Sequence, residues 1–99
     1  MAFKLIWSEE ALEDITSIAE YIEKDSPIYA KAVVSKFFEK VELLKKFSEL
    51  GRAVPEINEN SMRELFIYSY RLIYKIEQET ILIIAVIHGK RLLENYDQK

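Results

Sequence analysis

The apolar residues of this 99-residue chain change their spacing near its middle. Between residues 8 and 50 they recur every three or four positions, which is typical of amphipathic helices. Between residues 63 and 87 they alternate with polar residues or run together in short segments, as strands do. The apolar faces of the helices and of the strands must pack against each other to be buried. The pattern therefore predicts an α+β domain with a helical hairpin on one face of a small, mainly antiparallel sheet.

The first half predicts one short strand and two helices. Residues 3–7 alternate as a strand does, and Ser8 can cap a helix that ends near Lys24. Ser26 can cap a second helix, because Pro27 suits the first helical position. The linker of two or three residues makes the two helices an antiparallel hairpin. Gly51 is predicted as the left-handed residue that ends this segment.

The second half predicts a three-stranded meander after a loop at residues 51–61. The strands are expected at residues 63–68, 71–77 and 80–87, in the order strand, helix, helix and three strands overall. A turn is placed at residues 69–70, and the last strand is expected in the centre of the sheet because both its faces are apolar. The sheet face that carries Arg71 is expected to lie free of the helices, concave and functional.

Composition excludes several classes of protein. The chain has no cysteine and a single histidine, so neither a disulfide framework nor a metal site is expected. Its formal net charge of -3 argues against nucleic-acid binding by bulk charge. The longest apolar run is far shorter than a membrane span, and the acidic start is unlike a signal peptide. We expect one cytoplasmic domain over residues 1–99 with a polar tail at 92–99, and a solvated acidic face at Glu9, Glu10, Glu13 and Asp14.

Every arginine lies in the second half of the chain, although the net charge is negative. Arg71 opens one predicted strand and Arg91 follows the next, so antiparallel pairing should bring them together, with Tyr96 nearby. Such a set can clamp a phosphodiester and assist proton transfer. The alternative is an ordinary charged rim of a sheet. His88, at a strand end, is more often structural than catalytic.

The order of elements and several short motifs resemble the RelE/ParE superfamily of toxins from bacterial type II toxin–antitoxin modules, which include plasmid stabilisation proteins. The resemblance covers residues 3 to about 92. The motifs that carry it are Trp7, Ala11, Asp14-Ile15 and Tyr21-Ile22, Ser26-Pro27 and Ala30, Gly51-Arg52-Ala53-Val54-Pro55-Glu56, Arg63-Glu64-Leu65, Tyr70-Arg71-Leu72-Ile73-Tyr74, and His88-Gly89-Lys90-Arg91.

The resemblance implies one of two toxic activities. RelE-like toxins cleave mRNA in the ribosomal A site, and their catalytic set would correspond to Arg71, Arg91 and Tyr96, with His88 as a further candidate. Their lysine pair does not carry over, because Met62 and Glu64 occupy those positions. ParE-like toxins poison DNA gyrase without a ribonuclease set, and the run from Gly51 to Leu65 is more similar to that branch. We therefore expect a gyrase poison; a ribosome-dependent endoribonuclease and a non-toxic binding module are the alternatives.

The same resemblance implies a cognate antitoxin, and operator DNA is expected to be bound only through it. No cofactor and no membrane contact are expected, and homodimerisation is left open. Exposed aromatic residues are the candidate contacts with the antitoxin: Tyr29, Phe38 and Phe47. Basic residues of the second half are the candidate contacts with gyrase or with the ribosome and mRNA: Arg52, Arg63, Arg71, Lys90 and Arg91.

Overall fold

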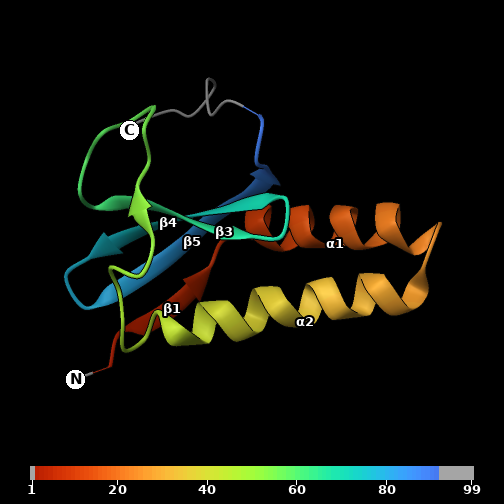
Figure 1. Cartoon of the computed structure of the whole chain (residues 1–99). Helices are drawn as coiled ribbons and strands as arrows, with labels where there is room; N and C mark the ends of the chain where they lie inside the picture. The colour runs from red at the N-terminus through yellow and green to blue at the C-terminus, as the bar shows by residue number, and fades with distance from the viewer. Residues whose placement is uncertain (1, 92–99) are drawn as a thin grey trace.

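The protein is a helical hairpin packed on a five-stranded sheet (Figure 1). The computed structural model describes residues 2–91, so the predicted tail at 92–99, with Tyr96, lies outside the described residues. The elements are β1 (Lys4–Trp7), α1 (Glu9–Glu23), α2 (Pro27–Leu43), β2 (Arg52–Ala53), β3 (Met62–Ile67), β4 (Tyr70–Glu77) and β5 (Thr80–His88). The sheet order is β1-β5-β4-β3-β2, with β1 parallel to β5 and all other pairs antiparallel. The α+β prediction is confirmed.

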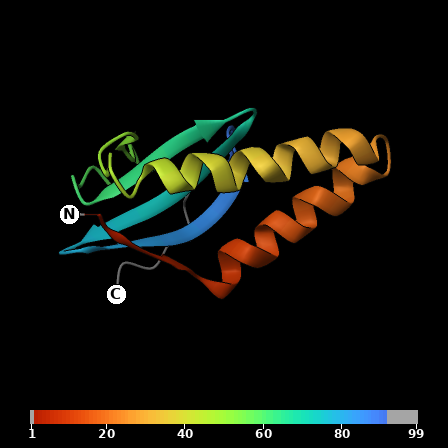
Figure 2. The same ribbon diagram turned by 90° about the horizontal axis from the view of Figure 1, so that it is seen from below.

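The helices begin where the sequence places them. The Ser8 hydroxyl accepts a hydrogen bond from the Ala11 N–H at 3.0 Å, and the Ser26 hydroxyl accepts one from the Tyr29 N–H at 3.1 Å. Each contact satisfies a backbone donor that a helix leaves unpaired in its first turn. Pro27 occupies the start of α2, where its missing N–H costs nothing. Figure 2 shows the two helices returning along each other on one side of the sheet.

The prediction that Gly51 ends the second helix is wrong. The helix α2 stops at Leu43, and no glycine among the described residues has a positive φ. Gly51 is required for a different reason, namely a close backbone approach. A Cβ atom on Gly51 would lie 2.3 Å from the carbonyl oxygen of Glu64, so only glycine lets this segment pass β3.

The main core lies between the hairpin and the sheet. The helices contribute Ala11, Ile15, Val33, Phe37 and Val41, and the strands contribute Ile67, Leu72, Tyr74, Ile81, Ile83 and Val86. The predicted alternation along β4 is confirmed, because Leu72 and Tyr74 face the helices whereas Ile73 belongs to a separate cluster on the other face. The strand β5 is an interior strand, but β4 is the middle one.

The expectation that the far face of the sheet lies free is wrong over part of its area. The loop between β2 and β3 folds across it and forms a second cluster in which Val54 contacts Met62 and Ile73. Ile57 of the loop and Ile84 of β5 pack against the same cluster. The loop is therefore part of the fold, because it buries apolar side chains that the helices cannot reach.

The helix α1 caps the edge of β5 beyond the end of β1. The Ser8 hydroxyl donates to the Ile84 carbonyl at 2.9 Å, and the Val86 N–H donates to Asp14 Oδ2 at 2.9 Å. These side chains satisfy backbone groups that would otherwise need a further strand. Asp14 is thus half-buried instead of lying on a solvated face as predicted, and burial raises the pKa of its carboxyl group.

The first hairpin turn differs by one residue from the prediction. The first turn is formed by Tyr68 and Ser69, and β4 already begins at Tyr70. Tyr68 and Gln78 each occupy the first central position of a two-residue turn, with φ of 56° and 52°. Positive φ matches the right-handed twist of the flanking strands, and glycine usually supplies it.

Candidate functional site

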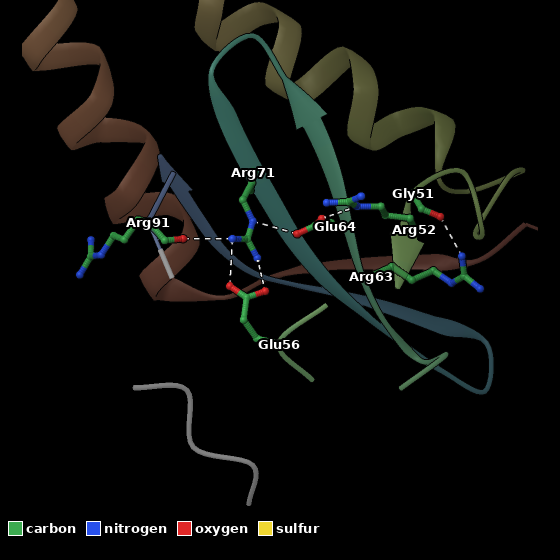
Figure 3. A network of polar contacts seen from close by, with 7 residues as sticks. All are labelled: Gly51, Arg52, Glu56, Arg63, Glu64, Arg71 and Arg91. Carbon is green, nitrogen blue, oxygen red and sulfur yellow. Dashed lines mark hydrogen bonds and ion pairs between the residues drawn. The ribbon is translucent and has the colours of Figure 1, made fainter. Parts of the chain in front are cut away.

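Side chains of alternating charge form a row across β2, β3 and β4 on the face away from the helices (Figure 3). Arg52 is paired with Glu64 in the register of β2 and β3, so their side chains share a face. Glu64 is paired with Ile73 on β4, and Arg71 precedes Ile73 by two residues and shares the same face. Glu56, from the loop between β2 and β3, ends the row.

Glu64 is a fully buried carboxylate held between two guanidinium groups. Its Oε2 lies 2.6 Å from Arg52 Nε, and its Oε1 lies 2.8 Å from Arg71 Nε. A carboxylate charge is costly to bury unless cations and hydrogen bonds replace its water. Arg52 supplies a charge and a hydrogen bond, and Arg71 supplies a second charge as an ion pair.

Arg71 is the centre of the row. Its side chain is 6% exposed, and its Nη1 and Nη2 donate to the two carboxylate oxygens of Glu56 at 3.0 and 2.9 Å. Nη1 also donates to the carbonyl oxygen of Arg91 at 3.0 Å. The Glu56 hydrogen bonds raise the pKa of Arg71, against the opposing effect of burial. One guanidinium thus joins β3, the loop and the chain just beyond β5.

The predicted approach of Arg71 and Arg91 is confirmed, but the contact is made by the Arg91 backbone. Figure 3 shows the Arg91 side chain pointing away from Arg71. The catalytic pairing of these two side chains is therefore not assembled. Tyr96 lies outside the described residues.

Arg63 and Arg52 lie near the loop but differ in exposure. Arg63 donates to the Gly51 carbonyl at 2.7 Å and to the Asn60 carbonyl and amide oxygens at 3.0 and 3.1 Å, so it joins the two ends of the loop. The Arg52 side chain is 63% exposed, and its guanidinium lies 5.3 Å from the ring centroid of Phe66.

His88 and Lys90 are exposed where the chain leaves β5. The His88 ring lies edge-on to Tyr70, with centroids 5.9 Å apart, and its Nδ1 accepts a hydrogen bond from the Lys90 N–H at 3.3 Å. Among residues 2–91, no carboxylate forms an ion pair with His88, so the structure places no acidic partner beside its ring.

The aromatic residues predicted to contact a partner are exposed but lie apart. Tyr29 packs against Tyr68 with ring centroids 6.0 Å apart, and Phe38 packs against Trp7 at 4.8 Å. Phe47 follows the end of α2 and is 58% exposed. The structure does not bring the three into one patch.

Sequence reasoning missed Phe66, which is 50% exposed on the face of the charged row. Phe66 is paired with Arg71 across β3 and β4. The period of two along β3 could have found it, because it places Phe66 on the same face as Glu64 and away from the helices.

Two kinds of site are absent from the part of the chain that is described. Histidine, aspartate and glutamate side chains nowhere gather in a group that could hold a metal ion. None of the helices has the length and apolar character needed to cross a membrane.

Comparisons with known proteins identify the fold and the family. Residues 5–93 match the model of a family described as the ParE toxin of the type II toxin–antitoxin system, parDE. The chromosomal ParDE system from P. aeruginosa contains a similar chain, with a TM-score of 0.74, 20% identity, and coverage of 90% of this chain and 98% of that one.

Two further solved structures share the fold. A mutant of the E. coli toxin RelE in the free state has a TM-score of 0.65 and 17% identity, covering 91% of this chain and 86% of that one. The YoeB dimer from Staphylococcus aureus has a TM-score of 0.62 and 19% identity, covering 89% and 98%. No curated protein matches the sequence significantly.

Proposed function

The chain belongs to the ParE toxin family of type II toxin–antitoxin systems, and on that basis we propose that it stops bacterial growth by poisoning DNA gyrase. The observation that carries the proposal is the match to the ParE family over residues 5–93. The proposed target places the protein in the cytoplasm, and a cognate antitoxin would neutralise it and connect it to operator DNA.

The contacts that occupy Arg71 in the charged row favour a gyrase poison over a ribonuclease. Ribonuclease chemistry needs cations that reach the scissile phosphate and a group that takes a proton. Arg71 is engaged by Glu56 and Glu64 within the protein. Met62 and Glu64, at the positions of the RelE-like lysines, are both buried.

The exposed cations are the groups we propose for contact with gyrase. They are Arg52, Lys90 and Arg91, whereas Arg63 and Arg71 hold the loop and the chain end in place. The antitoxin is proposed to cover apolar side chains of the helical hairpin, including Tyr29 and Phe38. Burying such side chains is favourable because they leave water.

Two assays on the purified protein test this proposal. We expect inhibition of gyrase supercoiling, together with intact mRNA in a translating extract. Codon-phased mRNA cuts with normal supercoiling would show the RelE-like ribonuclease instead. If induced expression leaves growth unchanged and neither assay responds, the chain is a binding module without toxic activity.

The matched variants are Arg91→Ala and Lys46→Ala, which each remove one exposed cation. Arg91→Ala is expected to weaken gyrase inhibition. Lys46→Ala, which changes a residue just after the C-terminal end of α2, is expected to leave it unchanged. Equal effects of the two would contradict the proposed contact surface.

A further inference from the structure

Phe66 is an exposed aromatic side chain within a basic surface. Its ring is 50% exposed on the sheet face away from the helices, and the Arg52 guanidinium lies 5.3 Å from its centroid. Gly89 flanks the ring on another side, because a Cβ built on Gly89 would lie 3.6 Å from Phe66 Cε1. Lys90 and Arg91 follow directly and are exposed.

The acidic groups closest to this surface are already neutralised. Glu64 is held by Arg52 and Arg71, and Glu56 is held by the fork of Arg71. The exposed side chains around Phe66 therefore leave a positive excess. By contrast, α1 has no lysine or arginine and carries Glu9, Glu10, Glu13, Asp14, Glu20 and Glu23.

We propose that Phe66 with Arg52, Lys90 and Arg91 forms a docking surface for an acidic segment of a protein partner. Carboxylates of the segment would pair with the three cations, and one apolar side chain would pack on the Phe66 ring. An aromatic anchor bordered by arginine is the composition that dominates the energetics of protein interfaces. Arg52 shows this chemistry within the folded chain, because its Nε already binds a carboxylate oxygen of Glu64 at 2.6 Å.

A protein partner fits this surface better than a nucleic acid. Binding through phosphates needs several cations, and each contact contributes to a steep salt dependence. Three exposed cations are few for that purpose, and the chain has a net charge of -3 that repels a polyanion at longer range. One acidic segment with an apolar residue needs only this small patch.

The inference deepens the proposed function and rests on it only for the identity of the partner. Its test uses the purified full chain labelled with ¹⁵N and, as probe, an eight-residue peptide of aspartate and glutamate with one central leucine. We expect amide shifts confined to residues around Arg52, Phe66, Gly89 and Lys90, and weaker binding as salt is raised. Shifts elsewhere, or none, would overturn the proposal.

Comparison probes identify what the surface recognises. The same peptide with lysines in place of its acids should not bind, and the peptide with serine in place of leucine should bind more weakly. An eight-nucleotide single-stranded RNA should bind less tightly than the acidic peptide. If the RNA binds more tightly at these residues, the surface is a nucleic-acid site and the proposal is wrong.

Two variants locate the contact on the protein. Phe66→Ser should weaken peptide binding about tenfold, as removal of an aromatic anchor does. Phe47→Ser, which removes another exposed aromatic ring, should leave binding unchanged. Lys90→Glu is a second variant outside the ion-pair row and should also weaken binding; an unchanged affinity in both Phe66→Ser and Lys90→Glu would refute the surface.

The peptide experiment is independent of gyrase. If the peptide binds as expected but supercoiling is not inhibited, the surface stands and only the proposed target changes. If supercoiling is inhibited but the peptide does not bind, the docking surface is wrong and the gyrase proposal stands.

Discussion

Replacing Arg71 by alanine is expected to destabilise the fold strongly, because it removes a cation from a fully buried carboxylate. Glu64 has 0% side-chain exposure, and its other cation, Arg52, is 63% exposed. Without Arg71, the carboxylate keeps one partner whose charge is largely screened by water. The Glu56 fork and the hydrogen bond to the Arg91 carbonyl are lost at the same time.

The expected loss of stability follows from the burial of Glu64 and the exposure of its remaining partner, Arg52. Removing one partner of a buried ion pair costs about 3 to 5 kcal/mol. Glu64→Gln should cost less, about 1 to 2 kcal/mol, because the amide oxygen still accepts from an arginine and Arg71 keeps its two hydrogen bonds to the Glu56 carboxylate. For a domain of this size, Arg71→Ala should lower the melting temperature by at least about 12 °C.

Urea unfolding of the two variants at pH 7 measures these differences. Lys75→Ala is the matched control, since Lys75 lies on β4 and pairs at the surface with Glu77. Its cost should stay below about 1 kcal/mol, as is usual for an exposed pair. If Arg71→Ala costs no more than Lys75→Ala, the row does not hold the fold together and the reasoning fails.

Three further changes probe the elements around the site. Tyr74→Phe should cost about 2 kcal/mol in urea unfolding, because the buried hydroxyl accepts from the Gly51 N–H and donates to a carbonyl, at 3.0 and 2.7 Å. The raised pKa of Asp14 makes its ionisation costly in the folded state, so it lowers the free energy of unfolding as the pH rises above about 4; Asp14→Asn should make this decline shallower. Asp14→Ala should cost about 1 to 3 kcal/mol, because it leaves the Val86 N–H unpaired. Gln78→Gly should raise the melting temperature by a few degrees, since glycine adopts the φ of 52° without strain; a lower melting temperature would show that this turn is not strained.

The parts of the fold that could be predicted are those determined by local signals. The serine caps at Ser8 and Ser26 act on donors three residues away, and the change of apolar period separates the hairpin from the meander. The strand set after residue 61 follows from its alternation and from the short turns between strands. Each of these features involves a few consecutive residues.

The parts that could not be predicted depend on contacts between distant segments. The short strand β2 exists because Arg52 and Ala53 reach β3 across the loop, and Gly51 is required because Glu64 lies against it. The burial of Arg71 depends on Glu56, fifteen positions away, folding over the sheet. Alternation placed Arg71 on the face away from the helices, but it gave no sign that a loop would cover it.

The arginines of this chain therefore belong to two groups that composition cannot separate. Arg63 and Arg71 donate hydrogen bonds to other groups of the protein. Arg52 has a largely exposed side chain, and Arg91 contributes only its carbonyl to the row. An alanine substitution in the first group removes structure, and any loss of toxicity follows from unfolding or from a displaced loop. A loss of toxicity with an unchanged melting temperature is expected only from Arg91, because Arg52 also pairs with the buried Glu64 carboxylate. The melting temperature of each variant therefore decides how its activity is to be interpreted.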